Sequence, residues 1–293
     1  MERLSISSTD LSLGKKHNRR KIMDISIYAP FPGLVEKLGW EGAADETVRL
    51  GCTSVETFSD VTAEESGLLL KNTDEAKEAR KILESRGLKV TCCSVFSNLY
   101  NSPREVESLK RQAEIAEALG SPFLHHTVLP WVQEDELPPF DEAMEVGLDA
   151  SEEVAKHAAD FGVTCLYEDQ GFYVNGIEGY ATFFNEMKRR CKNVGVCGDM
   201  GNSLFVDVPG EEFFKAFSKD ILHVHAKDYF RKTTPEEGWR RTLGGNWISS
   251  APMGEGIVDI DMCMKILADN GYNGAVAIED FDIPHSVKVL QKY

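Results

Sequence analysis

The chain has 293 residues, of which 42% are hydrophobic and 27% are charged. Its 48 Asp and Glu residues outnumber its 32 Lys and Arg residues, which gives a formal net charge of -16. A surface this acidic repels nucleic-acid phosphates and anionic membranes, so we expect neither as a partner. No run of about 18 apolar residues indicates a membrane span, and the first residues lack the apolar middle of a secretory signal. The sequence therefore predicts a cytoplasmic protein.

Residues 1–20 contain no strand-like run, and a basic cluster begins at Lys15. We interpret them as an N-terminal extension that precedes a single domain at residues 21–293. The seven Cys residues are odd in number and form no C-x-x-C pair. Several lie in apolar runs, which favours reduced and buried thiols over disulfide bonds or a zinc cluster.

Short apolar runs alternate with longer amphipathic segments along the whole chain. Most runs carry few polar residues before their last positions, as expected of parallel strands covered on both faces. The predicted strands are 21–29, 53–58, 89–96, 122–128, 163–169, 194–200, 221–228 and 275–280. The predicted helices between them are clearest at 74–87, 102–120, 141–162 and 259–271. Ser102 is the expected N-cap of the second of these helices, and Pro103 is its first residue.

Eight such units in about 270 residues match the size of a (β/α)8 TIM barrel. A doubly wound open sheet is the alternative, but it usually has a glycine-rich phosphate-binding turn after the first strand. Residues 28–33, YAPFPG, do not form one. We therefore predict an α/β protein, a single-domain (β/α)8 barrel without a nucleotide cofactor. Two long connections, 127–140 and 229–256, follow predicted strands at the end where barrels build their sites.

Four consecutive predicted strands each end in a side chain that can bind a metal. Glu168 ends strand five, Asp199 ends strand six, His225 ends strand seven and Glu279 ends strand eight. Each of these residues alone is more often a helix cap, an ion-pair partner or a core histidine. In a closed barrel, however, the four strand ends lie on one arc around a common centre. Three carboxylates and an imidazole suit a divalent ion, Mn²⁺ first, with Mg²⁺, Co²⁺ or Zn²⁺ as alternatives.

The motifs around these positions resemble a known family. They are LYEDQ (166–170), GDMGN (198–202), HVHAKD (223–228), PMGEG (252–256) and GYNGAVAIED (271–280). Together they are similar to the sugar (phosphate) isomerase/epimerase family of xylose-isomerase-like TIM barrels. The resemblance implies that Glu168, Asp199, His225 and Glu279 bind the metal. It also implies that Glu168 and Glu279 are the catalytic pair that removes and returns a substrate proton.

The reaction implied by the resemblance is isomerisation or epimerisation of a sugar or keto-inositol through an enediolate. A divalent ion acidifies the C–H bond beside a carbonyl that it binds. Two departures argue against simple ketohexose epimerisation: Asn202 stands where the ketohexose 3-epimerases have His, and Val174 stands where they have a second Glu. Asn202 also argues against an apurinic endonuclease, because those barrels need several more histidines for three zinc ions.

Metal-assisted elimination is the main alternative, because it begins with the same enolate. Members of the superfamily dehydrate keto-inositols, and the large subunits of bacterial C-glycoside deglycosidases are similar barrels that cleave 3-keto glycosides. A histidine base at strand four favours elimination, and His125 and His126 end that strand. Strand alternation predicts that one of them points into the barrel and the other toward the helices. A third hypothesis is a metal-binding or sugar-binding barrel without catalysis, which predicts a closed coordination sphere.

Five further residues are candidates for substrate binding: Asn202, Lys227, Glu56, Trp239 and Arg241. Lys227 follows His225 by two positions and is expected to point to the same side. Glu56 is expected to end strand two, where it would contact substrate or orient a ligand. Trp239 and Arg241 lie in the long 229–256 connection, although an exposed arginine is usually just solvated. We expect a small carbohydrate substrate, and assembly as a homo-oligomer or with a small partner subunit.

Overall fold

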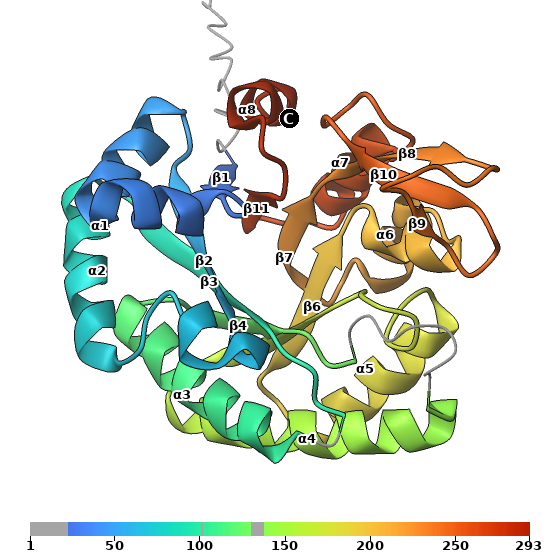
Figure 1. The fold of residues 1–293 in the computed structure, drawn as a ribbon, viewed down its shortest axis with the longest axis horizontal. Coiled ribbons are helices and arrows are strands. Elements are labelled where there is room, and N and C mark those ends of the chain that lie inside the picture. Colours follow the sequence, from blue (N-terminus) through green and yellow to red (C-terminus); the bar gives the residue numbers. More distant parts are fainter. Residues whose placement is uncertain (1–22, 101, 130–137) are drawn as a thin grey trace, which may run out of the picture.

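The structure is a computed structural model, and it describes residues 23–100, 102–129 and 138–293. Within these ranges eight parallel strands close into a barrel in the order β1-β11-β7-β6-β5-β4-β3-β2, with the helices outside it (Figure 1). The predicted (β/α)8 barrel is therefore confirmed. The predicted extension at residues 1–20 lies outside the described residues. The barrel strands are β1 Asp24–Ile27, β2 Ser54–Asp60, β3 Lys89–Phe96, β4 Phe123–His126, β5 Thr164–Glu168, β6 Val194–Asp199, β7 Ile221–Ala226 and β11 Ala275–Ile278.

A helix follows almost every barrel strand and packs on the outer face of the sheet. The α-helices are α1 Phe31–Arg49, α2 Thr73–Ser85, α3 Pro103–Leu119, α4 Phe140–Asp160, α5 Glu178–Arg190, α6 Gly210–Phe217, α7 Ile260–Asp269 and α8 Ile283–Leu290. Two short 3-10 helices, η1 Val61–Gly67 and η2 Asn202–Val206, follow β2 and β6. The helices α1 to α4 cover one side of the barrel, and α8 lies beside β1 and β11 (Figure 1).

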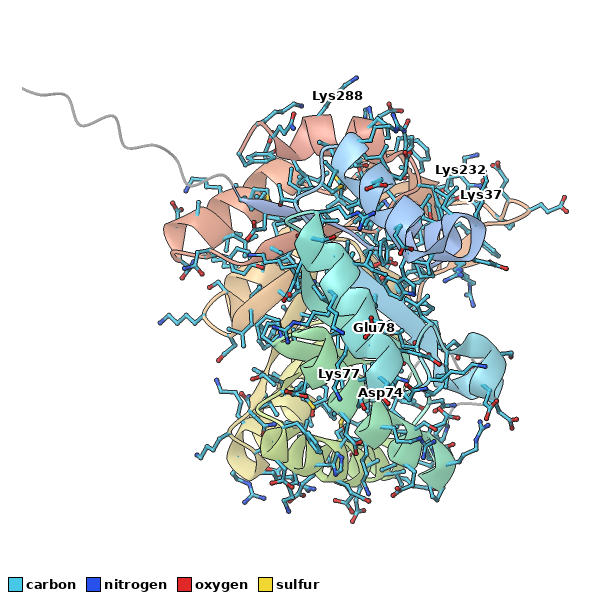
Figure 2. All side chains as sticks on the ribbon, turned by 90° about the vertical axis from the view of Figure 1, so that its left-hand side faces the viewer. Lys37, Asp74, Lys77, Glu78, Lys232 and Lys288 are labelled. Carbon is cyan, nitrogen blue, oxygen red and sulfur yellow. The ribbon has the colours of Figure 1, made fainter. Side chains whose placement is uncertain are left out.

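Helix α2 shows why the amphipathic pattern predicts these elements well. It begins at an N-cap, Asn72, whose side chain accepts hydrogen bonds from two backbone N–H groups. Ala76, Ala79 and Leu83 recur on one face and are buried. The charged side chains of the opposite face point outward, among them Asp74 and Lys77 (Figure 2).

Helix α3 agrees with its prediction in position but not in the detail of its cap. Ser102 is the N-cap residue and Pro103 the first helical residue, but the Ser102 hydroxyl donates to Glu105 Oε1 instead of capping the backbone. The helix ends at Leu119, and its C-cap Gly120 has a φ of 77°, in the left-handed region that glycine adopts without strain.

The 229–256 connection is more ordered than the sequence pattern indicated. It forms an antiparallel sheet of β8 Asp228–Lys232, β9 Arg240–Arg241 and β10 Trp247–Ala251, in the order β8-β10-β9. This sheet stands beside α6 and α7 at one side of the barrel (Figure 1). The missed signal is the Gly244-Gly245 pair, a hairpin-turn dipeptide in which Gly245 has a φ of 88°.

The largest hydrophobic core lies between the strands and the helices and includes Tyr167, Phe183 and Phe213. All seven cysteines are free and buried, as predicted. Among the helices of the described residues, none is both long and apolar enough to span a bilayer.

Candidate metal centre

The barrel brings together the four residues that the sequence placed at consecutive strand ends. Glu168 and Asp199 are the last residues of β5 and β6, His225 lies in β7, and Glu279 directly follows β11. Asp199 and His225 are level with each other in the register of β6 and β7, so their side chains lie on the same face of the sheet. The ligand atoms of all four residues lie within 4.8 Å of one another.

The turn after β6 holds Asp199 in place. Its Oδ1 accepts the backbone N–H groups of Gly201 at 2.8 Å and Asn202 at 2.7 Å. Its Oδ2 is buried, lies 3.2 Å from the Lys227 ammonium group and accepts no hydrogen bond from the described residues. The DMGN sequence thus fixes one carboxylate oxygen by local structure and leaves the other oxygen for the centre.

His225 is held from several sides. Its Nδ1 lies 2.6 Å from Glu168 Oε1, and its Nε2 lies 2.9 Å from Glu56 Oε1. The Tyr28 ring stacks on the imidazole at 4.6 Å between ring centres. Burial lowers the pKa of His225, but its contacts with Cys197, Glu56 and Glu168 outweigh burial and raise it well above 6.5.

Lys227 supplies positive charge to the centre. Its Nζ lies 2.7 Å from Glu279 Oε1, 3.0 Å from Asn202 Oδ1 and 3.2 Å from Asp199 Oδ2. Burial lowers the pKa of Lys227, but Asp199 and Glu279 outweigh burial and raise it well above its ordinary value. The ammonium group therefore partly offsets the negative charge of the carboxylates.

The two candidate proton carriers have altered acidity. Burial, together with the negative charge of Asp199, raises the pKa of Glu168 to about 7. Burial and the charge of Asp199 also raise the pKa of Glu279, against the opposing effect of Lys227. A carboxylate with a pKa near neutrality is well matched to accepting and returning a proton.

The donor set and its surroundings fit a divalent ion. Carboxylate oxygens and an imidazole nitrogen are ligands of Mg²⁺, Mn²⁺, Co²⁺ and Zn²⁺. Asp199 Oδ2 is a buried oxygen that lacks a hydrogen bond within the described residues. The side chains of Asp199 and His225 are fully buried, whereas that of Glu279 is 29% exposed. The centre is therefore open on the side of Glu279.

The two histidines of β4 point in opposite directions, as alternation predicted. His125 faces the centre, with its Nε2 at 3.8 Å from Glu168 Oε2, and burial lowers its pKa well below 6.5. His126 packs edge-on against Tyr167 at 5.3 Å, and burial lowers its pKa to about 4. Tyr167 belongs to the core beneath the helices. Of the two predicted catalytic histidines, only His125 faces the candidate centre.

The prediction that Glu56 ends its strand is wrong. It is the third residue of β2, which continues to Asp60, and its exposed fraction is 0%. At that depth its oxygens contact side chains of the barrel interior: His223 Nε2 lies 2.7 Å from Glu56 Oε2, and the Ser94 hydroxyl contacts Glu56 Oε1. Glu56 therefore contacts a candidate ligand, His225. Its depth inside the barrel does not support the predicted contact with substrate.

The other predicted substrate contacts lie at different distances from the centre. Asn202 is buried beside Lys227, and its Nδ2 has no partner among the described residues. Trp239 lies in the loop between β8 and β9, and Lys232 Nζ is 4.5 Å from its ring centre. Arg241 belongs to β9, level with Trp247. Substrate contacts by these residues stay predictions.

Asp228 explains the PMGEG motif at residues 252–256, which by sequence alone is only part of the resemblance to the family. Its carboxylate accepts the backbone N–H groups of Gly254 at 3.0 Å, Gly256 at 2.8 Å and Val258 at 3.0 Å. A Cβ at Gly256 would lie 2.2 Å from Asp228 Oδ1, so the MGEG turn needs glycine there. Alternation along β7 and into β8 is the signal that could have placed Asp228 on the side opposite Lys227.

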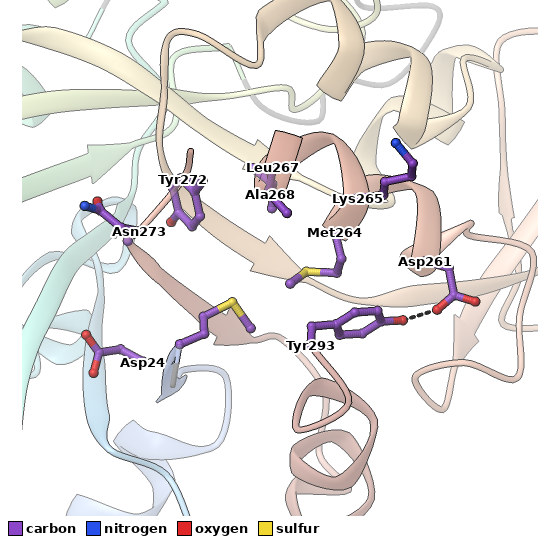
Figure 3. A pocket seen from close by; sticks show the side chains of 11 residues that line it. Asp24, Asp261, Met264, Lys265, Leu267, Ala268, Tyr272, Asn273 and Tyr293 are labelled. Carbon is purple, nitrogen blue, oxygen red and sulfur yellow. Dashed lines mark hydrogen bonds between the residues drawn. The ribbon is translucent and has the colours of Figure 1, made fainter. Parts of the chain in front are cut away.

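A separate cavity of about 490 Å³ opens at the other end of the barrel (Figure 3). It lies beside Asp24, the first residue of β1, and Gly274, which precedes β11. Tyr293 closes one side, where its hydroxyl donates to Asp261 (Figure 3). Barrel enzymes place their chemistry at the opposite, C-terminal strand ends, so we do not assign the reaction to this cavity.

Residues 44–293 match the model of the family described as Xylose isomerase-like TIM barrel. The chain therefore belongs to this family, which the sequence motifs predicted. A search of curated proteins found no significant match.

Solved structures share the fold at low sequence identity. A D-psicose 3-epimerase from Clostridium cellulolyticum, solved with D-tagatose, is 17% identical with a TM-score of 0.67, over 92% of this chain and 95% of that one. The probable 3-DHS dehydratase AsbF from Bacillus anthracis is 13% identical with a TM-score of 0.67, over 92% and 98%. A xylose isomerase-like barrel from Mycobacterium smegmatis, in complex with magnesium, is 15% identical with a TM-score of 0.65, over 87% of each chain.

Proposed function

We propose that this protein is a divalent-metal-dependent enzyme that isomerises or epimerises a sugar or keto-inositol by proton transfer. The observation that carries the proposal is the buried cluster of Glu168, Asp199, His225 and Glu279 at the C-terminal rim of the barrel. The family supports it, because the similar structures include a sugar epimerase and a magnesium complex. Mn²⁺ is the ion we propose, since three of the four donors are carboxylates.

A divalent ion at this centre would polarise a carbonyl and its neighbouring hydroxyl and so acidify the C–H bond between them. Glu168 and Glu279 are the residues that we propose move the proton, one removing it and the other returning it. Glu168 stands on the buried side of the cluster, with 3% of its side chain exposed. Glu279 stands on the exposed side of the cluster, where a substrate can approach.

Two side chains would orient the substrate. The Nδ2 of Asn202, which has no hydrogen-bond partner in the part of the chain that the structure describes, is a donor for a hydroxyl or carbonyl oxygen. Lys227 Nζ holds Glu279 and the Asn202 carbonyl in one place, so it orients both a proton carrier and a substrate donor. The open side also supports catalysis over a closed, purely metal-binding centre.

The test is to strip the protein with a chelator, reload it with Mn²⁺, Mg²⁺, Co²⁺ or Zn²⁺, and incubate it in D₂O with ketoses and keto-inositols. We expect deuterium at one carbon and an isomer of unchanged atomic composition, seen by NMR. Glu168→Gln should slow exchange by about 10²- to 10⁴-fold, the usual contribution of a general base. Full exchange by the metal-free protein would contradict the proposal.

Metal-assisted elimination is the second candidate, and one observation favours it. His125 Nε2 is buried, faces Glu168 Oε2 at 3.8 Å and has no hydrogen-bond partner among the described residues. A neutral imidazole there is placed to accept the substrate proton whose removal begins an elimination. The fold shared with a probable dehydratase is consistent with this reaction. Release of water from a keto-inositol, or of a phenol from a 3-keto glycoside, would favour elimination over isomerisation.

A further inference from the structure

Glu56 is an unusual residue for the position that it occupies. The interior of a (β/α)8 barrel is normally filled by layers of Val, Ile and Leu, yet Glu56 is a fully buried carboxylate in the middle of β2. A buried carboxylate is costly unless it is paired and hydrogen-bonded. Its partners are His223 Nε2 at 2.7 Å, His225 Nε2 at 2.9 Å and the Ser94 hydroxyl.

We propose that Glu56 is a positioning residue that sets the tautomers of two imidazoles at the candidate metal centre. It directs the Nδ1 lone pair of His225 and the Nε2 lone pair of His125 toward that centre. The inference rests on the proposed function, because that function supplies the ion that the His225 lone pair would bind and the substrate proton that the His125 lone pair would accept.

The first tautomer follows from the contact between Glu56 and His225. An ionised carboxylate can only accept hydrogen bonds, so the His225 nitrogen at 2.9 Å must carry the hydrogen. That nitrogen is Nε2. Without an ion the other nitrogen also carries a hydrogen, and it would lose that hydrogen and supply its lone pair when an ion binds. It is Nδ1, which lies 2.6 Å from Glu168 Oε1 and 3.7 Å from Glu279 Oε2, among the other candidate ligands.

The second tautomer follows through Ser94. Its hydroxyl has one hydrogen, and its contact with Glu56 Oε1 requires that this hydrogen point to the carboxylate. The same Oγ lies 2.8 Å from His125 Nδ1, so there it can only accept, and Nδ1 carries the hydrogen. The remaining lone pair of His125 is on Nε2, a buried atom that faces Glu168 and has no hydrogen-bond partner within residues 23–100, 102–129 and 138–293.

The register of the barrel makes this chain of contacts possible. Ser94 is level with His125 in the pairing of β3 and β4, so both side chains lie on the inner face of the barrel. Glu56 lies in β2, and its two imidazole partners lie in β7, 167 and 169 residues away in the sequence. Their contacts therefore cross the barrel interior. The Glu56 carboxylate therefore contacts His225 directly and His125 through the Ser94 hydroxyl.

A second metal site is the competing explanation for this cluster. Ligand atoms of Glu56, Cys92 and His223 also lie within 4.8 Å of one another. However, both Glu56 oxygens already accept hydrogen bonds, so an ion there would have to replace existing contacts. Metal stoichiometry separates the two explanations, because a positioning role requires one ion per chain and a second site requires two.

The experiment compares the native chain with Glu56→Gln, Ser94→Ala and Glu105→Gln. Glutamine has nearly the same shape as glutamate but presents an N–H₂ group where an imidazole N–H now donates. Glu105 provides the matched control, since it is also a buried glutamate with hydrogen bonds, to Asn98 and Ser102, but it lies in α3 away from the centre. Tautomers are read from ¹⁵N–¹H NMR of histidine-labelled, Zn²⁺-loaded protein, and affinity from Co²⁺ titration.

We expect Glu56→Gln to weaken Co²⁺ binding by about 10- to 100-fold, the usual effect of losing a partner of a metal-ligating histidine, and to change the His225 tautomer. Ser94→Ala should change the His125 tautomer at native Co²⁺ affinity, and Glu105→Gln should change neither. Native affinity and native tautomers in Glu56→Gln would overturn the proposal, as would two ions per chain of which one requires Cys92. These readouts involve no sugar, so an inactive native protein with the expected tautomers would count against the proposed reaction and leave the role of Glu56 supported.

Discussion

Lys227 Nζ lies 2.7 Å from Glu279 Oε1, inside the cluster that we propose binds the ion. The same ammonium group is 3.2 Å from Asp199 Oδ2, and the residue is 7% exposed. In the metal-free protein the Lys227 ammonium group contacts both of these carboxylates. The stability of the protein and its metal binding should therefore be linked through this residue.

Replacing Lys227 by Met should destabilise the metal-free protein by about 3–5 kcal/mol, because removal of one partner leaves buried carboxylates uncompensated. Added Mn²⁺ should restore much of that loss, since the ion neutralises the same carboxylates. Thermal unfolding with chelator and with Mn²⁺ measures both effects. An equal loss of stability with chelator and with Mn²⁺ would show that Lys227 and the ion do not neutralise the same carboxylates.

His225→Ala and Asp199→Ala each remove one of four candidate ligands and should greatly weaken metal binding. Metal analysis of the purified variants, after dialysis against Mn²⁺, measures the effect. His285→Ala is a useful comparison, because His285 contacts the Met253 carbonyl and lies in α8, away from the cluster. Stoichiometric and tight metal in His225→Ala would contradict the assignment.

Glu168 should make the metal-free protein less stable as the pH rises from about 4.5 to about 7, whereas the lowered pKa values of His125 and His126 act in the opposite direction. Burial raises the pKa of Glu168 to about 7, above the ordinary value of 4.5, so the folded state binds more protons than the unfolded state in this window. Stability falls with pH wherever the folded state binds more protons. Urea unfolding of the native protein and of Glu168→Gln across this range measures the contribution of Glu168, because the opposing histidine contributions are common to both proteins. An equal dependence of stability on pH in the two proteins would show that Glu168 is not the group responsible.

Asp228→Asn should lower stability without removing a metal ligand. The carboxylate accepts backbone hydrogen bonds from the turn at residues 252–256, and hydrogen bonds to charged groups contribute about 1.5–3 kcal/mol each. Gly256→Ala should act similarly, because its Cβ would lie 2.2 Å from Asp228 Oδ1. Chemical denaturation measures both losses, and Mn²⁺ titration of the folded variants checks that the ion still binds.

His125 and His126 should differ in their effects on the reaction. His125 faces Glu168, whereas His126 packs against Tyr167 in the outer core. His125→Asn should therefore change the rate or the product distribution on the active sugar, and His126→Asn should act on stability. Product analysis by NMR, with unfolding midpoints of both variants, tests this contrast. The reverse pattern would place the catalytic histidine on the other face of β4.

Local patterns in the sequence determined the barrel and the arc of candidate ligands. Apolar runs and amphipathic segments repeat with a fixed order, and each pattern depends on near neighbours in the chain. Glu168, Asp199, His225 and Glu279 could be found because parallel strands of a closed barrel bring equivalent ends to one rim. The Gly244-Gly245 hairpin was equally local, so β8, β9 and β10 were predictable in principle.

The interior contacts were decided by the tertiary structure. Glu56 and His225 are 169 residues apart, and their contact depends on strand register, on the shift in pairing between Val55 and Glu56, and on the closure of the sheet. The stacking of Tyr28 on His225 has the same origin. Sequence periodicity determines which face a side chain takes, but the depth of a residue in a barrel, and its partner across the interior, depend on how all eight strands are staggered.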